Sequence, residues 1–464
     1  MFYISLLTIA LALAGFTWLG LRASYLHAEL DDYVTARNSQ GAAGLGLSFL
    51  ASGMGAWILF APPEVGAFVG PVALAGYAIG AAAPFLVFAL FGNAIRRHVP
   101  RGRSIGEFAE HCYGRGVRRW VSLISALYML CFLAAELTAI GGITSLLSDI
   151  PGAATIIAVA ITTLAYTALG GLRASLVTDR WQAWLLIGLL TLVGGVVTIM
   201  PADVDFHAPL PGVPPAQALS VALALVIAVT AANIFHQGYW QRVWAARDGG
   251  ALGRGAVLGG ITTVAVVAVV GGLGMLAAMS GLSLGQPPIP FFALLNAAPA
   301  WVAPLALLLA VTLVASSVDT LQNGIASLLV TESRGRRVTL GAARAVTVVL
   351  MVPVVVIALQ DLSVLRLFLI ADLLCTAMVA PVLLGLWSRM SASGAVWGGV
   401  GGLAGAVAAG WITSGSLQAG LVAASFPGGE PTLGPFAGAL LVSIAVSLVI
   451  AAVAPRREPV KRVD

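Results

Sequence analysis

Three hydroxyl groups and a carboxylate stand close together in a stretch that is otherwise apolar. The hydrophobic run over residues 301–330 contains Ser316, Ser317, Asp319 and Thr320. An ionisable group at membrane depth costs several kcal/mol unless it is paired, hydrated or bound to an ion, so such groups mark ion or substrate pathways. Hydroxyls alone often bond back to their own helix or across a helix interface. A carboxylate has no comparably cheap local partner, and the pattern therefore predicts an ion or substrate site.

The composition is that of an integral membrane protein. Of the 464 residues, 59% are hydrophobic and only 9% are charged, and the mean hydropathy is +0.98. This is far too little charge to cover a soluble surface of that size. A spanning helix needs about 20 mainly apolar residues. Thirteen such runs begin near residues 2, 42, 71, 119, 152, 181, 217, 254, 301, 338, 363, 391 and 435.

The distribution of basic residues predicts the orientation. With the N-terminus outside, 23 of the 24 Lys and Arg residues lie on one side of the membrane, and only Arg366 lies on the other. Because cytoplasmic loops carry the Lys/Arg excess, we expect a multi-pass protein of the cell membrane (plasma or inner membrane) with its C-terminus in the cytoplasm. The net charge of +5 then reflects topology and contact with the lipid bilayer, and is no indication of nucleic-acid binding.

Two of the expected spans contain helix-breaking residues in their interiors. Gly53, Gly55, Pro62 and Pro63 interrupt the second span, and residues 233–238 of the seventh read Asn-Ile-Phe-His-Gln-Gly. Irregular backbone at membrane depth is tolerated where it is buried in protein or lines a cavity. Two breaks in corresponding halves are typical of a transporter built from inverted repeats. The alternative is that glycine and proline are simply common in membrane helices.

Five short motifs follow one another along the chain at intervals that match one known family. They are Asp32-Tyr33 with Ala36-Arg37, and residues 51–54, 166–182, 240–242 and 316–320. Together they resemble the sodium/solute symporters, which include proline, sugar, sialate, pantothenate and iodide carriers. The resemblance implies an all-α integral membrane fold of the LeuT type, with 13 transmembrane helices.

The same resemblance implies a division of the chain into three parts. Residues 1–41 would form the first transmembrane helix and a cytoplasmic loop. Residues 42–389 would form the transport core, a five-plus-five inverted repeat. Residues 390–464 would add two helices and a basic cytoplasmic tail.

A sodium site between the first and eighth core helices is implied by the resemblance. The matching positions are Ala51, Met54 and Leu313, which would offer backbone carbonyls, and Ser316 and Ser317, which would offer hydroxyls. Neutral oxygens suit a monovalent hard cation and hold it weakly enough for release, whereas several carboxylates would better suit a divalent ion.

A second cation or proton site is implied at Asp179, Ser316, Asp319 and Thr320. Two carboxylates around one cation can both stay ionised, and without a cation one of them tends to hold a proton. For Asp179, a salt bridge to a neighbouring arginine, Arg173 or Arg180, is the structural alternative. The chain also departs from the proline carriers, which have an aspartate where this sequence has Gly53. Proline is therefore in doubt as the solute.

Several polar and aromatic residues near the two breaks are candidates for solute contacts. They are Trp57, Glu64, Glu136, His236 and Gln237. An aromatic lid with a few polar groups suits a small-solute cavity. Packing and buried hydrogen bonds explain the same residues nearly as well. Asp372, in the last core helix, has the same two interpretations: it would bind or gate the solute, or it would bond between helices.

These observations predict a secondary active transporter. We expect sodium-coupled symport of a small polar organic solute, such as an amino acid, a urea-like compound, a monocarboxylate or a sugar, by a monomer working through alternating access. The alternatives are a proton-coupled symporter of the same fold and a transporter-like membrane sensor. The sequence has none of the common catalytic motifs, so we expect no enzyme and no cofactor other than the coupling ion.

Overall fold

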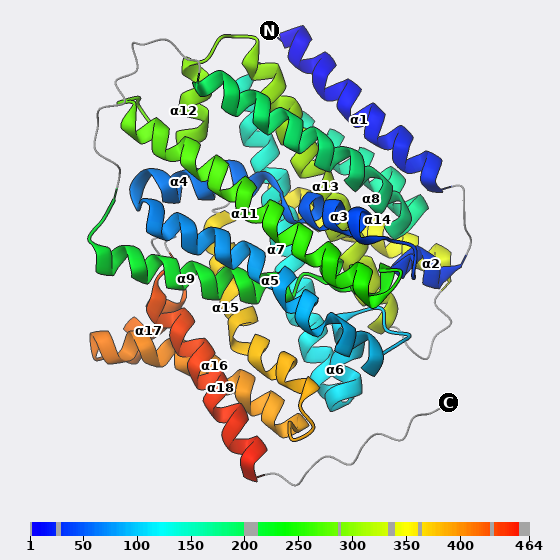
Figure 1. Cartoon of the computed structure of the whole chain (residues 1–464), viewed down its shortest axis with the longest axis vertical. Coiled ribbons are helices and arrows are strands. Elements are labelled where there is room, and N and C mark those ends of the chain that lie inside the picture. The colour runs from blue at the N-terminus through cyan, green and yellow to red at the C-terminus, as the bar shows by residue number, and fades with distance from the viewer. Residues whose placement is uncertain are drawn as a thin grey trace.

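The fold is helical throughout the part of the chain that the structure describes. The computed structural model describes residues 2–24, 29–198, 212–285, 289–332, 339–360, 364–426 and 431–453. Figure 1 shows the helices packed into one bundle, with α1 along an outer edge and α16, α17 and α18 at the opposite end of the view. The last residues of the basic tail, and Arg334 to Arg337, lie outside the described residues.

The transmembrane part consists of long helices joined by short connections. In chain order the elements are α1 (Phe2–Ser24), α2 (Leu30–Thr35), α3 (Ala42–Gly53), η1 (Ala56–Leu59), α4 (Ala61–Phe68), α5 (Pro71–His98), α6 (Ile105–Tyr113), α7 (Arg115–Leu147), α8 (Gly152–Thr198), α9 (Pro215–Ile234), α10 (Gln237–Ala245), α11 (Gly249–Met279), α12 (Pro290–Ala297), α13 (Val302–Glu332), α14 (Leu340–Ala358), α15 (Val364–Leu383), η2 (Leu384–Leu386), α16 (Ala392–Ser414), α17 (Leu417–Ala424) and α18 (Leu433–Val453).

The number of spans depends on how two bent elements are counted. Among the described residues, 11 helices are long and apolar enough to cross a membrane, or 12 if the bent pair α3 and α4 forms one span. Helix α8 has 47 residues, about twice what a bilayer needs. Its backbone turns at Gly171, where φ is 56° and a Cβ would lie 2.3 Å from the Tyr33 carbonyl oxygen. The expected count of thirteen follows only if α8 contributes two spans, and it stays a prediction.

Both expected interruptions are present. Helix α3 ends at Gly53, and helical structure resumes at Ala56. The two halves, Ala42–Gly53 and Ala56–Phe68, are bent by 66° relative to each other. Helix α9 ends at Ile234, and α10 begins at Gln237. The prediction of two broken helices is therefore confirmed. The broken helices lie beside α13, which is the most buried of the candidate spans.

Candidate functional site

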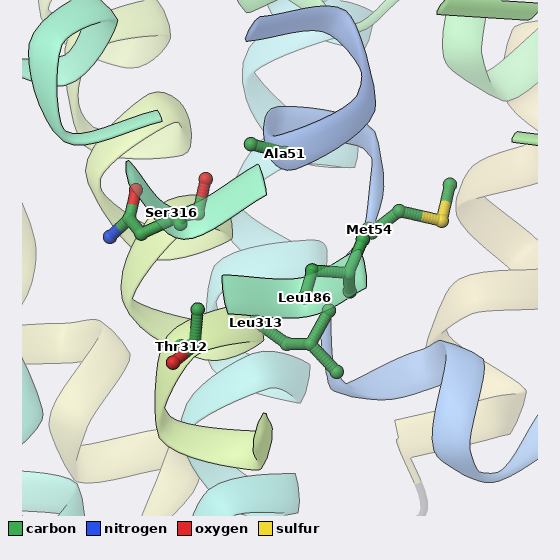
Figure 2. Close-up of a pocket in the computed structure, with 7 residues that line it drawn as sticks. Ala51, Met54, Leu186, Thr312, Leu313 and Ser316 are labelled. Carbon is green, nitrogen blue, oxygen red and sulfur yellow. The ribbon is translucent and has the colours of Figure 1, made fainter. Parts of the chain in front are cut away.

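The first break and α13 meet at a small pocket. About 140 Å³ of space between atoms is lined by Ala51, Met54, Gln182, Leu186, Thr312, Leu313 and Ser316. Figure 2 shows Thr312, Leu313 and Ser316 on one side of this space and Ala51 and Met54 on another. Four of the five residues predicted to bind sodium therefore line one pocket. Gln182 and Leu186 of α8 were not predicted, because nothing in the sequence places that part of α8 beside the break.

The two serines differ in their hydrogen bonding. The Ser316 hydroxyl donates to Oδ1 of Asp179 at 3.0 Å. The Ser317 hydroxyl is completely buried, and among the described residues neither it nor the side-chain amide of Gln182 has a hydrogen-bond partner. A buried polar group without a partner costs about 1–3 kcal/mol. These unpaired oxygens are the kind of ligand that a bound cation would use.

The end of α3 adds further oxygens. The backbone N–H of Met54 donates to the Leu50 carbonyl at 3.0 Å, and the indole of Trp57 donates to the Gly53 carbonyl at 3.2 Å. The Ala51 carbonyl also accepts from the Met54 N–H, at 3.3 Å. Each carbonyl oxygen has a second lone pair for a further contact, and the C-terminal end of a helix is the negative end of its dipole. The break therefore presents an electronegative helix end beside the hydroxyls of α13, and the residues present fit a monovalent cation.

Asp179 has a cationic partner within the protein. Its Oδ2 accepts hydrogen bonds from Nη2 of Arg242 at 2.7 Å and from the hydroxyl of Ser48 at 2.5 Å. The side chains of both Asp179 and Arg242 are 0% exposed. The arginine also donates to the Gly238 carbonyl of its own helix, α10, at 2.8 Å. Its contact with Asp179 therefore joins the second broken helix to α8.

This pair corrects two expectations. Arg173 pairs with Asp32 at 2.5 Å and Arg180 donates to Gln40 at 2.7 Å, so neither is the partner of Asp179. Arg242 was counted with the cytoplasmic charges, but it is buried inside the bundle. Arg242 follows Gly238 by four residues and lies inside the second interrupted span. This position in the sequence could have predicted its burial.

Asp319 is surrounded by hydroxyl groups. Its carboxylate accepts hydrogen bonds from Tyr166 at 2.7 Å, Ser175 at 2.7 Å, Thr178 at 3.1 Å and Thr320 at 3.3 Å. None of the ion pairs recorded for the described residues involves Asp319. The two predicted carboxylates thus lie in different surroundings, one against a guanidinium and the other among hydroxyls.

Glu136 and Gln237 have structural hydrogen bonds. Oε2 of Glu136 accepts a hydrogen bond at 2.7 Å from the backbone N–H of Ala56, the first helical residue after the break. Gln237 accepts from the N–H of Ile105 at 3.0 Å and donates to the Arg103 carbonyl at 2.7 Å. Glu136 therefore caps the interrupted helix, and Gln237 fastens the second break to the loop before α6.

The other solute candidates lie around aromatic rings. Trp57 stacks on Tyr77 with ring centroids 5.5 Å apart, and His236 stacks on Tyr239 at 4.5 Å. Both ring nitrogens of His236 are buried, and neither has a hydrogen-bond partner among the residues described. Glu64 lies in the first turn of α4.

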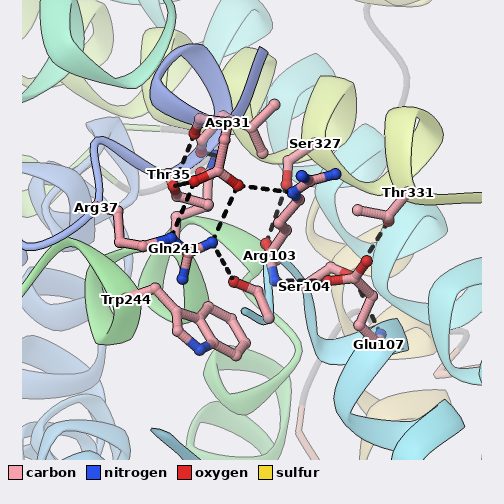
Figure 3. Close-up of polar contacts among 12 residues, drawn as sticks. Asp31, Thr35, Arg37, Arg103, Ser104, Glu107, Gln241, Trp244, Ser327 and Thr331 are labelled. Carbon is pink, nitrogen blue, oxygen red and sulfur yellow. Dashed lines mark hydrogen bonds and ion pairs between the residues drawn. The ribbon is translucent and has the colours of Figure 1, made fainter. Parts of the chain in front are cut away.

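A second polar cluster, which was not predicted, lies near α2 and the loop before α6 (Figure 3). Asp31 pairs with Nε of Arg37 at 2.9 Å and with Nε of Arg103 at 2.8 Å. Burial raises the pKa of Asp31, but the hydrogen bonds from Arg37 and Arg103 outweigh it, so the pKa lies below the ordinary value of 3.8. Arg103 also accepts through its carbonyl from Gln237 at 2.7 Å and from Ser327 at 3.2 Å. The cluster therefore links α2, α10 and α13.

Comparisons with known proteins identify the same kind of molecule. A Candida albicans protein described as a spermidine transporter is 29% identical over 374 residues, which are 79% of this chain and 72% of the relative. A Na⁺-coupled sialic acid symporter in a substrate-bound outward-open state has a TM-score of 0.78, with 16% identity over 98% of this chain and 99% of that one. A nucleobase-cation-symport-1 family transporter in a closed conformation has a TM-score of 0.59, with 16% identity over 91% and 95% of the two chains.

The bundle with its two broken helices has the LeuT-type fold that these two structures share. The model of the sodium:solute symporter family matches residues 33–402. The chain belongs to this family, and the resemblance noted in its motifs is confirmed.

Proposed function

We propose that the protein carries out sodium-coupled symport of a small polar organic solute by alternating access. The observation that carries this proposal is the meeting of the broken end of α3 with Leu313 and Ser316 of α13 at one small pocket, together with the buried, unpaired hydroxyl of the adjoining Ser317 among the described residues. The Ala51, Met54 and Leu313 carbonyls and these two hydroxyls would hold the sodium ion. In the cell membrane, we propose, the N-terminus faces outward, and helices within the core over residues 42–389 rock against one another to open the site to each side in turn.

Coupling follows from where the ion would bind. A ligand shifts a conformational equilibrium only by its difference in affinity between two states. Sodium between α3 and α13 would join two helices that separate when the cytoplasmic side opens, so the ion would favour the outward-open state. Solute entering next to Trp57 and His236 would then complete the load. Release into a low-sodium cytoplasm would follow.

The sodium site is tested without knowing the solute. We expect the Ser316→Ala, Ser317→Ala double variant to raise the sodium concentration for half-maximal thermal stabilisation of the purified protein at least tenfold, with potassium as the replacement ion. Thr312→Val is the matched control, because this hydroxyl lines the same pocket but donates to the Leu308 carbonyl of its own helix at 2.7 Å. An unchanged sodium dependence in the double variant would refute the site.

A second candidate is coupling to a proton or a second sodium ion. It is favoured by the surroundings of Asp319, whose carboxylate, among the described residues, is bonded only to hydroxyl groups. Asp179 and Thr320 would complete this second site, although Arg242 already neutralises Asp179. Proton movement accompanying solute counterflow in proteoliposomes, abolished by Asp319→Asn, would support proton coupling. Counterflow that follows sodium at every pH would favour sodium alone.

The nature of the solute is open to a narrower proposal. The Candida albicans relative is described as carrying spermidine, an amine, whereas the structural neighbours are described as carrying other ligands. At such levels of identity the solute does not transfer from any one relative. The residues of this chain must decide it.

A further inference from the structure

Aromatic rings gather at the centre of the bundle where α7, α10 and α15 meet. We call Tyr128, Phe132, His236, Tyr239 and Phe368 the ring cluster. His236 contacts Tyr128 and Phe132 with ring centroids 6.4 and 6.0 Å apart, and Phe132 contacts Phe368 at 5.2 Å. Tyr239 stacks on His236 with ring centroids 4.5 Å apart. The cluster therefore joins the second broken helix to α7 and α15.

One carboxylate belongs to this cluster. Asp372 lies one turn after Phe368 on α15, and the two share a helix face because side chains four residues apart are neighbours. The carboxylate is close enough to Tyr128 and Tyr77 to interact with them electrostatically. Leu369 and Leu373, on another face of α15, pack against α9, α16 and α18.

The Asp372 carboxylate is unsatisfied in a way that the other buried acids are not. The residue is 9% exposed, and its Oδ1 has no hydrogen-bond partner in the part of the chain that the structure describes. By contrast, Asp179 has Arg242, Asp319 has its hydroxyls, and Glu136 has the Ala56 N–H. A buried carboxylate oxygen without a partner is unfavourable, the more so when the group is ionised. A partner that arrives with the solute would remove this cost.

We propose that Asp372 and the ring cluster bind an alkylammonium group, so that the transported solutes are organic amine cations. The proposal rests on the proposed transport function and names its substrate class. The carboxylate supplies a charge-assisted hydrogen bond to the N–H donors of an amine, or an ion pair to a quaternary ammonium. The faces of Tyr128 and Phe132 attract the same cation through their quadrupoles. The unpaired nitrogens of His236 offer one further acceptor.

Other solute classes fit these residues less well. An anion would meet the carboxylate of Asp372, and Arg242, the arginine next to the cluster among the described side chains, is already bonded to Asp179 and Ser48. A sugar needs many hydrogen-bonding side chains, whereas most of the groups here are ring faces. The aspartate found in proline carriers has no room in this chain, because a Cβ on Gly53 would lie 2.7 Å from the Tyr239 hydroxyl.

The test compares solutes that differ in charge but hardly in shape. The two pairs are 1,4-diaminobutane with 1,4-butanediol, and choline with 3,3-dimethyl-1-butanol. We expect at least one amine to raise the thermal midpoint of the purified protein in sodium chloride, while its neutral counterpart does not. Asp372→Asn should raise the concentration for half-maximal stabilisation by that amine at least tenfold, and Asp372→Glu should restore most of it. Asp149→Asn, an exposed acid away from the cluster, is the control.

The outcomes separate this proposal from the proposed function. If sodium stabilises the protein but neither amine does, or if Asp372→Asn leaves the amine affinity unchanged, the amine proposal is wrong and sodium coupling stands. If sodium has no effect on the wild type, the sodium coupling fails whatever the amines do. The comparison of charged and neutral solutes uses only the wild type, so it decides the question even if Asp372→Asn does not fold.

Discussion

At the scale of single residues, the site combines hydroxyl groups of α13 with a buried ion pair between Asp179 and Arg242. The motif at residues 316–320 predicted buried oxygens that bind an ion or a substrate, because hydroxyls and a carboxylate in an apolar run are costly unless they are paired or bound. The partner of Asp179 could not be predicted in the same way. Arg173 and Arg180 are near it in sequence, but the guanidinium that contacts it belongs to Arg242, 63 residues away. Pairing across such a separation depends on the packing of whole helices.

The buried pair makes a clear prediction for stability. Arg242→Met should destabilise the protein by about 3–5 kcal/mol, because it leaves Asp179 charged and unpaired in the interior. The double variant Arg242→Met, Asp179→Leu should recover part of this loss, since the unpaired charge is gone. Arg247→Met is the control, because the Arg247–Asp248 pair is exposed and surface pairs contribute about 0–1 kcal/mol. Unfolding in a denaturant series would measure all three, and a double variant no more stable than the single one would contradict the explanation.

At the scale of helices, both interruptions were predicted but their caps were not. Glycines, prolines and clustered polar residues indicate where a helical ladder fails. They do not indicate which distant side chain satisfies the exposed backbone. Here Glu136 of α7 bonds the Ala56 N–H, and Ser125 of the same helix donates to the Phe235 carbonyl at 2.6 Å. One helix thus supports both breaks.

The cap at the first break distinguishes a structural role of Glu136 from a chemical one. We expect Glu136→Gln to keep nearly normal sodium stabilisation, because the amide oxygen can still accept from Ala56. Glu136→Leu should raise the half-maximal sodium concentration at least tenfold, since the break loses its acceptor. Thermal-shift titrations compare the two variants. If glutamine is as damaging as leucine, the negative charge itself is required, and the solute or proton role becomes the better explanation.

The Asp31 cluster gives a prediction for pH. A lowered pKa means that the ionised Asp31, with its contribution to stability, is fully present above pH 3.8 and is lost as the pH falls through the lowered value. Between pH 5 and 8 the contacts with Arg37 and Arg103 should therefore not change. Asp31→Asn should loosen the link between α2, α10 and α13 at every pH, and we expect faster thiol labelling of the buried position in Ser327→Cys. Asp248→Asn is the control, because asparagine can still cap α11. Equal labelling in both variants would show that Asp31 does not hold these helices together.

At the scale of the whole molecule, composition and charge were sufficient for the class of protein and for most of its helices. They were insufficient for an exact count. The two apolar runs that begin near residues 152 and 181 appear as one 47-residue element that turns at Gly171, and a positive φ at one glycine has no signature in hydropathy. The orientation across the bilayer likewise remains a prediction, because it depends on the surroundings of the protein.

A single helix tests the orientation. Helix α7 runs from Arg115 to Leu147, and exposed residues lie at both ends. With the N-terminus outside, Asp149→Cys should react with a membrane-impermeant maleimide on intact cells, and Arg115→Cys only after permeabilisation. The background should be low, because Cys112 and Cys375 are buried and Cys131 is partly so. The opposite labelling pattern would reverse the topology.

The Arg242–Asp179 pair also has an electrical consequence. A guanidinium keeps its proton at any physiological pH, so the pair is neutral and should contribute nothing to the current that accompanies a transport cycle. That current should then report the charges of the bound ligands and of the remaining carboxylates. At 100 mV each elementary charge moved inward contributes about 2.3 kcal/mol, or a roughly 50-fold accumulation. A solute that is itself a cation would thus be concentrated by the membrane voltage twice over, once through sodium and once directly.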